Sequence, residues 1–331
     1  MKPKLLLTLL LSVATFYIGV AQTVKTLATF EVSIRGLSVV NDRVIWVSGT
    51  HGAIGISRDS GNTFKWISVR GFEETDFRDI EAFDETTAVI MGTGEPAYIL
   101  RTADAGETWE AVFVDKTKGM FLDAMEFWNE NSGIVIGDPI DQKFFIGRTF
   151  NGGITWRGIP PENYPVADDG EACFAASGTN ICKINNKEVV FVTGGKKSRL
   201  FIRDKKIDIP FTTDSASIGA NSVAAKNSKM YIVVGGNYLA KDSTSNNCFI
   251  TKEAGNKWIV PKTPPSGYRS CVEYIEKKQW VTCGFNGVDI TNDDGMNWKR
   301  ISDEGYNVCR KSKSGDAVFF AGDGKIGKLI F

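Results

Sequence analysis

An eight-residue pattern that occurs five times constrains the fold of this chain more than any other feature. It reads Ser/Thr-x-Asp-x-Gly-x-Thr-aromatic, and the last two copies are the most divergent. The copies are SRDSGNTF, TADAGETW, TFNGGITW, TKEAGNKW and TNDDGMNW, which begin at Ser57, Thr102, Thr149, Thr251 and Thr291. Their glycines are separated by 45, 47, 102 and 40 residues, so the long interval holds two repeats, one of which lacks the pattern. A period of this length indicates a repeat architecture.

Short β-rich segments recur with the same period. Residues 78–112 contain RDIEAF, TAVIMGTG, AYILRT and TWEAVF, separated by turn residues, and similar runs follow along the chain. Such groups of strands indicate four-stranded propeller blades. The apolar run typical of the second strand of a blade occurs seven times, which indicates seven blades. We therefore predict an all-β, seven-bladed β-propeller of four-stranded blades. We expect its N-terminal strand, KTLATFEVS, to pair with the C-terminal blade, because closing the ring hides exposed sheet edges.

The repeated residues themselves suit a turn. An Asp side chain such as Asp104 accepts hydrogen bonds from the amides of its own turn, Gly106 permits a positive φ, and Trp109 can pack against a neighbouring sheet. Equivalent acids at five places around a ring are not expected to be catalytic, so we interpret the repeat as structural. The residues assigned this structural role are Asp59, Gly61, Asp104, Gly106, Trp109, Asn151, Gly153, Trp156, Gly255, Trp258, Asp293, Gly295 and Trp298.

The first 21 residues resemble a secretory signal peptide. Lys2 and Lys4 precede an apolar run, and small residues end it at Ala21. We expect cleavage near Ala21, a single propeller domain over residues 22–331, and a periplasmic or extracellular location. The remaining chain has a net charge of −2 and no long basic run, so we expect no nucleic-acid partner. We also expect no membrane span and a monomer.

All six cysteines lie in the second half of the chain. Cys271 and Cys283 flank the hairpin-like stretch VEYIEKKQWVT, so they are placed to face each other across two strands. Export permits a disulfide there, and buried free thiols are the alternative. No C-x-x-C pair indicates a zinc site.

The five copies resemble the Asp-box, or bacterial neuraminidase repeat, and their spacing resembles the photosystem II assembly and stability factor family of propellers. The resemblance covers nearly the whole chain after residue 21. It implies that each copy lies at the turn between the third and the outermost strand of a blade, away from the usual binding face. Sialidases, receptors and assembly factors all carry this repeat, so the resemblance identifies an architecture and leaves the function open.

The sequence offers little support for catalysis. A sialidase resemblance implies an arginine in an Arg-Ile-Pro context before the first copy, whereas Arg35 is followed by Gly36. His51 is the only histidine, and no glycine-rich segment has the strand-to-helix context of a nucleotide-binding loop. We predict no metal and no cofactor. The favoured function is binding or assembly, with a protein segment or a glycan as the partner. The alternative is a glycoside hydrolase or lyase that uses carboxylates at the channel mouth.

Polar residues gather in the segments that we expect on the face opposite the repeat, and several stand where innermost strands begin. Residues at equivalent positions can converge on one ligand, although loops are also polar simply because they face water. The predicted ligand-binding residues are Arg35, His51, Arg78, Asp79, Glu95, Asp123, Asp138, Glu171, Asn237, Tyr238 and Arg269. Alanine changes at Asp79, Glu171 and Arg269 are expected to abolish binding in protein that remains folded.

Overall fold

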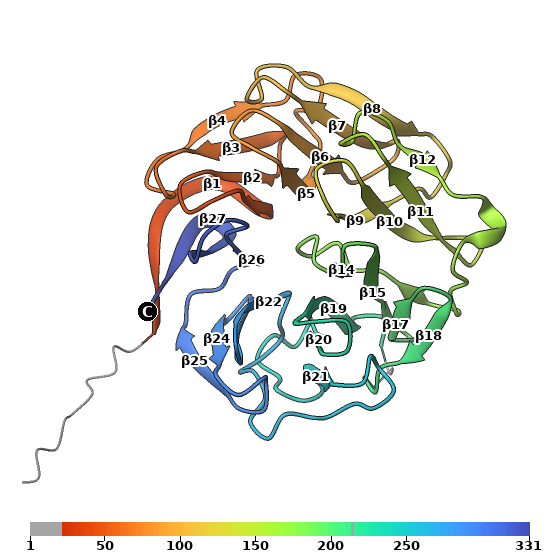
Figure 1. Cartoon of the computed structure of the whole chain (residues 1–331), viewed down its shortest axis with the longest axis vertical. Helices are drawn as coiled ribbons and strands as arrows, with labels where there is room; N and C mark the ends of the chain where they lie inside the picture. Colours follow the sequence, from red (N-terminus) through yellow and green to blue (C-terminus); the bar gives the residue numbers. More distant parts are fainter. Residues whose placement is uncertain (1–21, 213–214) are drawn as a thin grey trace, which may run out of the picture.

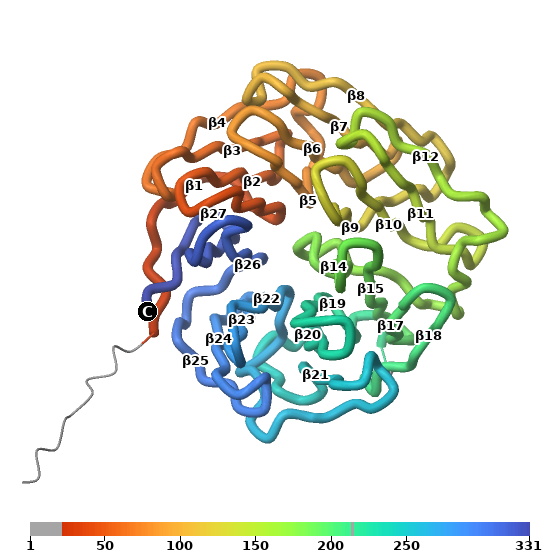
Figure 2. Tube along the Cα trace, in the orientation of Figure 1, coloured from red at the N-terminus to blue at the C-terminus, as the bar shows by residue number. Residues whose placement is uncertain are grey.

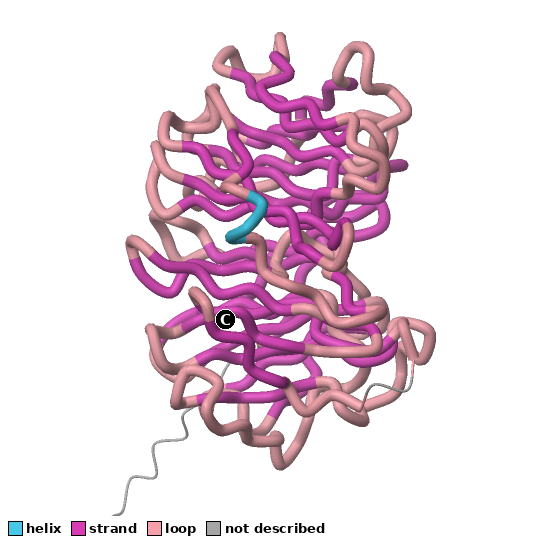
Figure 3. The backbone as a smooth tube through the Cα atoms, turned by 90° about the vertical axis from the view of Figure 1, so that its right-hand side faces the viewer, coloured by secondary structure: helices cyan, strands magenta, loops and turns pink. Residues whose placement is uncertain are grey.

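The computed structural model describes residues 22–212 and 215–331, so the predicted signal peptide lies outside the described residues. Its β-sheets are arranged as a ring around a central axis, which is the arrangement of a β-propeller (Figure 1). The chain passes around the ring once, and its two ends meet at the same place (Figure 2). Within the described residues the one helical segment is the 3₁₀ turn Pro161–Asn163, and nearly all other regular structure is strand (Figure 3).

Antiparallel pairing orders the strands in each sheet. The sheet that holds both ends contains β26 (Val308–Lys311), β27 (Val318–Ile330), β1 (Thr23–Val39), β2 (Ile45–Gly49), β3 (Ala53–Ser57) and β4 (Lys65–Ser68). The next sheet contains β5 (Phe77–Ala82), β6 (Ala88–Gly92), β7 (Ala97–Thr102) and β8 (Glu110–Asp115). The sheet after it contains β9 (Leu122–Phe127), β10 (Gly133–Ile140), β11 (Lys143–Thr149) and β12 (Arg157–Gly158).

The second half of the chain supplies the remaining sheets. One contains β14 (Ile181–Asn185), β15 (Glu188–Val192), β17 (Arg199–Ile202) and β18 (Lys205–Asp208). Another contains β13 (Glu171–Ala172), β16 (Gly194–Gly195), β19 (Ile218–Ala225), β20 (Tyr231–Asn237) and β21 (Cys248–Thr251). The last contains β22 (Cys271–Glu276), β23 (Gln279–Gly284), β24 (Gly287–Thr291) and β25 (Trp298–Ser302).

The prediction of seven four-stranded blades is wrong. The described residues form six hydrogen-bonded sheets, each of which is one blade, and four of these six sheets have four strands. The cause is β1, which is 17 residues long: its first part pairs with β27, whereas Ile34–Val39 pairs with β2. One strand therefore joins into a single sheet the strands that the sequence pattern assigned to two separate blades.

The expected pairing between the two ends of the chain is present. Thr23 lies opposite Ile330 and Ala28 opposite Ile326 in the β1–β27 ladder. The red and blue ends of the chain run side by side in Figure 2. This ladder closes the ring, because it pairs the edge of β27 with the edge of β1 and leaves neither of these edges exposed.

The repeated turns are closed by their own side chains. In the copy between β7 and β8, the Thr102 hydroxyl donates to Asp104 Oδ1 (2.8 Å) and accepts the N–H of Gly106 (3.0 Å), where φ is +79°. Asp104 Oδ1 also accepts the N–H of Thr108 (2.9 Å), and the Thr108 hydroxyl donates to Oδ2. The hydrogen bonds from Thr108 and Thr102 lower the pKa of Asp104 to about 2. Asp59, Asn151 and Asp293 make the equivalent bonds.

The core lies between neighbouring sheets, and the repeated turns reach into it. A Cβ on Gly153 would lie 2.7 Å from Val89 Cγ2 of the adjacent sheet, so only glycine allows this approach. Trp156, three residues later, packs edge-on against Phe127 with 5.6 Å between ring centroids. Trp109 contacts Trp46 of the preceding sheet in the same edge-on manner at 6.5 Å. The turns at Gly106 and Gly153 therefore each pack their own sheet against the preceding one.

The cysteines are free thiols. Cys271 and Cys283 lie directly opposite each other in the β22–β23 ladder, as predicted, and Cys309 Sγ lies 3.6 Å from Cys271 Sγ. Over residues 22–212 and 215–331, the fold contains no helix with the length and hydrophobicity that crossing a bilayer requires.

Candidate functional site

Four inner strands carry a similar β-bulge: in β5, β9 and β19 it lies within the first four residues, and in β1 it lies where the pairing with β2 begins. In the pairing of β1, β5, β9 and β19 with the next strand, the register skips Arg35, Arg78, Asp123 and Asn221, respectively. A bulged residue is left out of the ladder, and its side chain is directed differently from those of its neighbours. The same irregularity thus places two arginines, one aspartate and one asparagine at equivalent positions around the axis.

The four bulged residues line one cavity of about 440 Å³, which we call the bulge cavity. Strand direction alternates within each sheet, so the repeated turns emerge on one face and the links between sheets on the other. The inner strands begin on the linking face, so the bulge cavity lies opposite the repeated turns. Its lining is completed by Phe121, Asp138, Ala172, Cys173, Phe174, Ala175, Ala176, Tyr238, Tyr268 and Phe285.

One side of the bulge cavity is basic. Arg35 Nη1 donates to the carbonyl of Ala176 (3.3 Å), and Arg78 Nη1 donates to the carbonyl of Ala175 (3.4 Å). Burial, together with the charge of Arg35, lowers the pKa of Arg78. The buried Nε of Arg78 has no hydrogen-bond partner among the described residues. These two guanidinium groups keep donor capacity for an anionic group of a ligand.

The other side is acidic. Asp123 is completely buried, whereas Asp138 is partly exposed and accepts the N–H of Cys173 (2.8 Å). Burial and the nearby charge of Asp138 raise the pKa of Asp123 well above its usual range, and burial raises the pKa of Asp138 to about 6. Each of Asp123, Asp138 and Cys173 has a donor atom within 4.8 Å of those of the other two.

Aromatic rings form the rest of the wall. The rings of Phe174 and Tyr238 meet edge-on, with their centroids 6.1 Å apart. The ring centroids of Tyr268 and Phe285 lie 5.0 Å apart. The Tyr268 hydroxyl donates to Asn221 Oδ1 (2.7 Å), which fixes one bulged side chain. Tyr238 and Phe285 remain 41% and 42% exposed, so apolar surface faces the cavity opening.

Five of the predicted ligand-binding residues line this cavity. They are Arg35, Arg78, Asp123, Asp138 and Tyr238. Three others lie outside its wall. His51 is exposed in a turn, Glu95 accepts the N–H of Gly119 (2.7 Å), and Asn237, the last residue of β20, accepts the hydroxyl of Ser217 (2.8 Å).

Asp79 lines a different space, an axial cavity of about 360 Å³. Its carboxylate accepts the N–H groups of Ile80 and Met125 (both 2.8 Å) and so connects β5 to β9. Burial is the largest cause that raises the pKa of Asp79, to about 7. The bulge explains this placement, because consecutive residues Arg78 and Asp79 leave the strand in different directions.

The axial cavity is ringed by charged residues that the sequence analysis did not select. Ion pairs join Lys313 to Glu81 (2.8 Å), Arg310 to Glu273 (3.8 Å) and Lys183 to Glu126 (3.9 Å), and all six residues line the cavity. The available signal was a glutamate in the interior of a largely apolar inner strand, as Glu126 in LDAMEF and Glu273 in CVEYIE.

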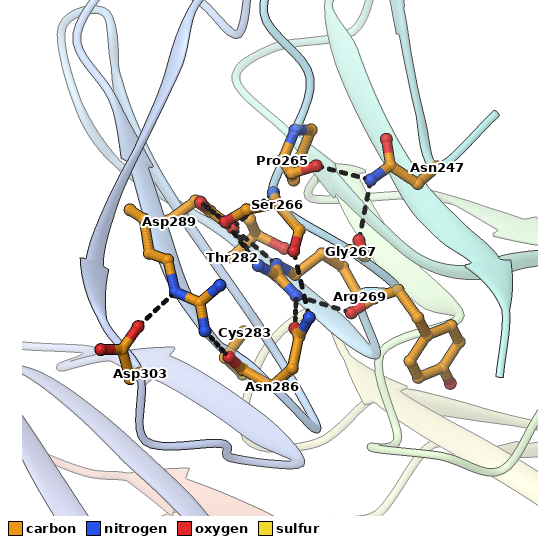
Figure 4. Close-up of polar contacts among 12 residues, drawn as sticks. Asn247, Pro265, Ser266, Gly267, Arg269, Thr282, Cys283, Asn286, Asp289 and Asp303 are labelled. Carbon is orange, nitrogen blue, oxygen red and sulfur yellow. Dashed lines mark hydrogen bonds and ion pairs between the residues drawn. The ribbon is translucent and has the colours of Figure 1, made fainter. Parts of the chain in front are cut away.

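Glu171 and Arg269 do not line either cavity. Glu171 is buried and pairs with Arg199, whose Nε donates to Glu171 Oε1 (2.9 Å). Arg269 is fully buried between Asp289, whose Oδ2 accepts from Nε (2.7 Å), and Asn286, whose Oδ1 accepts from Nη1 (2.6 Å). Figure 4 shows this network, which ties the segment before β22 to β24. Both residues hold loops in place around the cavity.

Sequence reasoning missed several residues of the bulge cavity. These are Phe121, Cys173, Phe174, Asn221, Tyr268 and Phe285. Asn221 occupies the same position in its strand as Arg78 and Asp123, so the blade alignment could have found it. Phe121, Phe174 and Tyr268 come from links between sheets, and Phe285 comes from the turn between β23 and β24. No repeated pattern marks any of these segments.

The ring of antiparallel sheets and its axial cavities define the chain as a β-propeller. Neither a protein-family model nor a curated protein sequence matches it. Among solved structures, YCF48 bound to D1 peptide is similar with a TM-score of 0.68 and 15% identity, covering 97% of this chain and 100% of that chain. YCF48 from Cyanidioschyzon merolae gives 0.66 and 16%, covering 93% and 98%. The WD40 propeller domain of Doa1 gives 0.60 and 14%, covering 94% and 96%.

These similarities concern the fold. The expected likeness to photosystem II assembly factor propellers is confirmed at that level by the two YCF48 structures. The assignment of the repeated turns to the Asp-box family stays a prediction.

Proposed function

We propose that this chain is an exported propeller that binds an extended protein segment in the bulge cavity. The observation that carries the proposal is the convergence of Arg35, Arg78, Asp123 and Asn221 from four equivalent bulges onto one open space. A cavity with a few oriented polar groups and an apolar wall is typical of a binding site. The similarity in fold to YCF48, solved with a D1 peptide, supports a peptide as the ligand.

The chemistry of the wall defines the segment that would fit. Arg35 and Arg78 suit a carboxylate, either of an acidic side chain or of a chain end, because guanidinium groups bind carboxylates with paired hydrogen bonds. Phe174 and Tyr238 offer apolar and aromatic surface to a neighbouring side chain. We therefore propose a segment that combines a carboxylate with a bulky apolar residue.

Short synthetic peptides test this proposal. Each peptide carries one aromatic residue. Each is made in four versions, which combine a free or an amidated C-terminus with the presence or absence of an internal glutamate. Fluorescence anisotropy on the protein starting at Gln22 should show saturable binding only for peptides with a carboxylate. Arg35→Ala and Arg78→Ala should each weaken it about 10- to 100-fold, as expected for a charge-assisted hydrogen bond.

Arg58→Ala is the matched control, since Arg58 is an exposed arginine beside the Asp59 turn. It should leave peptide affinity unchanged. Equal binding of amidated, acid-free peptides, or an equal loss with Arg58→Ala, would contradict the proposed role of the cavity arginines.

A carbohydrate ligand is the second candidate. The observation that favours it is the proximity of the Asp123 and Asp138 carboxyl groups at the wall of the bulge cavity, since paired carboxylates perform glycoside hydrolysis. A glycan panel incubated with the protein separates these functions. Turnover that is lost in Asp138→Asn would support the enzyme, whereas saturable peptide binding without glycan turnover supports the binding module.

Export is proposed from the sequence of residues 1–21. Expression of the full chain in a bacterial host, followed by fractionation and mass determination, should find a product beginning at Gln22 in the periplasm or medium. An uncleaved cytoplasmic product would contradict it.

A further inference from the structure

The Asp123 carboxyl group lacks the partners that its burial requires. It is 0% exposed, and neither of its oxygen atoms has a hydrogen-bond partner among the described residues. Buried polar groups in folded proteins are nearly always satisfied, and an unpaired buried carboxylate is costly. The side chain lines the bulge cavity. Its surroundings therefore suit a species that supplies positive charge to both oxygens.

Two further donors converge on the same point. Asp138 comes from β10 and Cys173 from the segment that follows β13, and their donor atoms lie with those of Asp123 within 4.8 Å of one another. Zinc bonds to oxygen at about 2.0–2.2 Å and to thiolate sulfur at about 2.3 Å, so donors around one ion lie no more than about 4.6 Å apart. This is slightly less than the 4.8 Å that bounds the separations here, so small side-chain rotations are needed to bring all three donors onto one ion. The hydrogen bond from the Cys173 N–H to Asp138 holds two of the three donor residues together.

We propose that Asp123, Asp138 and Cys173 bind a zinc ion at the wall of the bulge cavity. The thiolate selects the metal: magnesium and calcium take oxygen ligands, whereas zinc accepts sulfur and oxygen together. Three protein ligands leave a fourth position for water or for a group of the cavity's ligand, as in open zinc sites. On binding, the Cys173 thiol and whichever of the Asp123 and Asp138 carboxyl groups are protonated release their protons to solvent, and lone pairs of the sulfur and of the carboxylate oxygens form the bonds to zinc.

The charges balance. Two carboxylates and one thiolate carry three negative charges, zinc supplies two positive charges, and Arg78 is the adjacent cation whose charge acts on Asp123. With zinc bound, the negative charges of Asp123, Asp138 and Cys173 are neutralised by zinc and Arg78, so all these groups can lie together at the wall of the bulge cavity. The proposal does not rest on peptide binding, because its test uses the metal alone.

Metal-stripped protein tests the site directly. Titration with zinc chloride in a calorimeter should show one tight site and release of protons that depends on buffer identity. Cobalt(II) should give the intense near-ultraviolet absorption of a cobalt–thiolate bond. Cys173→Ser should abolish that absorption and weaken zinc binding by about 100-fold or more, and Asp123→Asn should weaken it by about 10- to 100-fold.

A second thiol cluster provides the matched control. Cys271, Cys283 and Cys309 are buried and also lie within 4.8 Å of one another. Cys271→Ser should leave the cobalt absorption unchanged. If Cys271→Ser abolishes it while Cys173→Ser keeps it, the metal occupies the other cluster and the proposal is wrong.

A metal-free measurement separates a missing site from a misfolded variant. Asp123→Asn keeps the shape of the side chain without its charge, so the metal-free variant should melt at a higher temperature than the parent. Zinc should raise the melting temperature of the parent by more than that of Asp123→Asn, because the variant binds zinc more weakly. Absence of any zinc response in a folded parent would overturn the proposal, and the peptide test at Arg35 and Arg78 would still stand by itself.

Discussion

Arg78 and Asp123 hold the same place in neighbouring inner strands, each being the residue that a β-bulge leaves out of its ladder. They carry opposite charges to the wall of one cavity. A backbone irregularity shared between blades therefore sets the direction of these side chains, and the residue type sets the chemistry. Changing the residue at a bulge should alter the ligand while leaving the ring intact.

The turn at Asp104 should matter for stability and not for binding. Thr102→Val removes the hydroxyl that accepts the buried N–H of Gly106 and should lower the free energy of unfolding by about 1–3 kcal/mol. Asp104→Ala should also lower it, because the turn loses the bonds from Thr108. Urea denaturation measures both effects. Loss of peptide binding in either variant, with normal stability, would show that the repeated turn has a functional role.

Arg269 should prove structural. Arg269→Ala leaves the buried carboxylate of Asp289 without its partner and should cost about 3–5 kcal/mol. The double variant Arg269→Met, Asp289→Leu removes both charges and should recover most of that loss. Thermal melting gives the comparison, and peptide affinity in the folded double variant should equal that of the parent. An unstable double variant would mean that the hydrogen bonds of Arg269 to Asn286 and the backbone dominate.

Stability should fall as the pH rises from about 4 to about 7. Burial raises the pKa of Asp79 from 3.8 to about 7 in the folded protein. Between these values the folded state holds a proton that the unfolded state has lost, so raising the pH favours unfolding. The full stabilisation is present below pH 4, and about 4 kcal/mol is lost by pH 7.

Asp79→Asn should flatten this dependence in urea denaturation measured at several pH values. Part of the slope should remain, because burial also raises the pKa of Glu273 to about 7 and that of Glu126. Arg310 and Glu81 face the same axial cavity and are not changed in the variant. Asp104→Asn is the control, since its pKa is lowered, and it should leave the slope between pH 4 and 7 unchanged. An unchanged slope in Asp79→Asn would refute the assignment.

Removal of residues 22–33 should destabilise the whole ring. These residues form the part of β1 that pairs with β27, and each lost hydrogen bond costs about 0.5–1.5 kcal/mol, so the total reaches several kcal/mol. The shortened protein should also aggregate, because β27 then presents a free edge. A chain beginning at Thr23 serves as control. Equal melting temperatures for both chains would contradict the closing role of this ladder.

The repeated pattern was sufficient to predict the propeller, because each copy encodes a complete turn through bonds within eight residues. It could not give the number of sheets, since the pairing of β1 with both β2 and β27 depends on contacts between the ends of the chain. The polar starts of the inner strands suggested Arg35, Arg78 and Asp123 as ligand-binding residues, and the structure places all three in the wall of one cavity. The pattern did not separate Arg78 from Asp79, because it does not show which side chain of the pair faces which cavity when a bulge interrupts the regular alternation along the strand.

Glu171 and Arg269 illustrate a second limit. Both are charged, like several cavity residues, but each has a buried partner far away in the sequence. Glu171 pairs with Arg199, 28 positions away, and Arg269 pairs with Asp289, 20 positions away. Nothing in the local sequence of either residue reveals that partner. Tyr268 and Phe285 were missed for the opposite reason, since they are aromatic residues in a link between sheets and in the β23–β24 turn, respectively, and such segments carry no period at all.

The ladder between β1 and β27 also imposes an order on folding. Thr23 and Ile330 pair across almost the entire described chain, and contacts of such sequence separation form slowly because a long loop must close first. Because β1 precedes β27 in the chain, it must wait until β27 has been synthesised. Until β1 pairs with β27, Arg35 lies on an unclosed ring, so the wall of the bulge cavity is complete only after this pairing has formed.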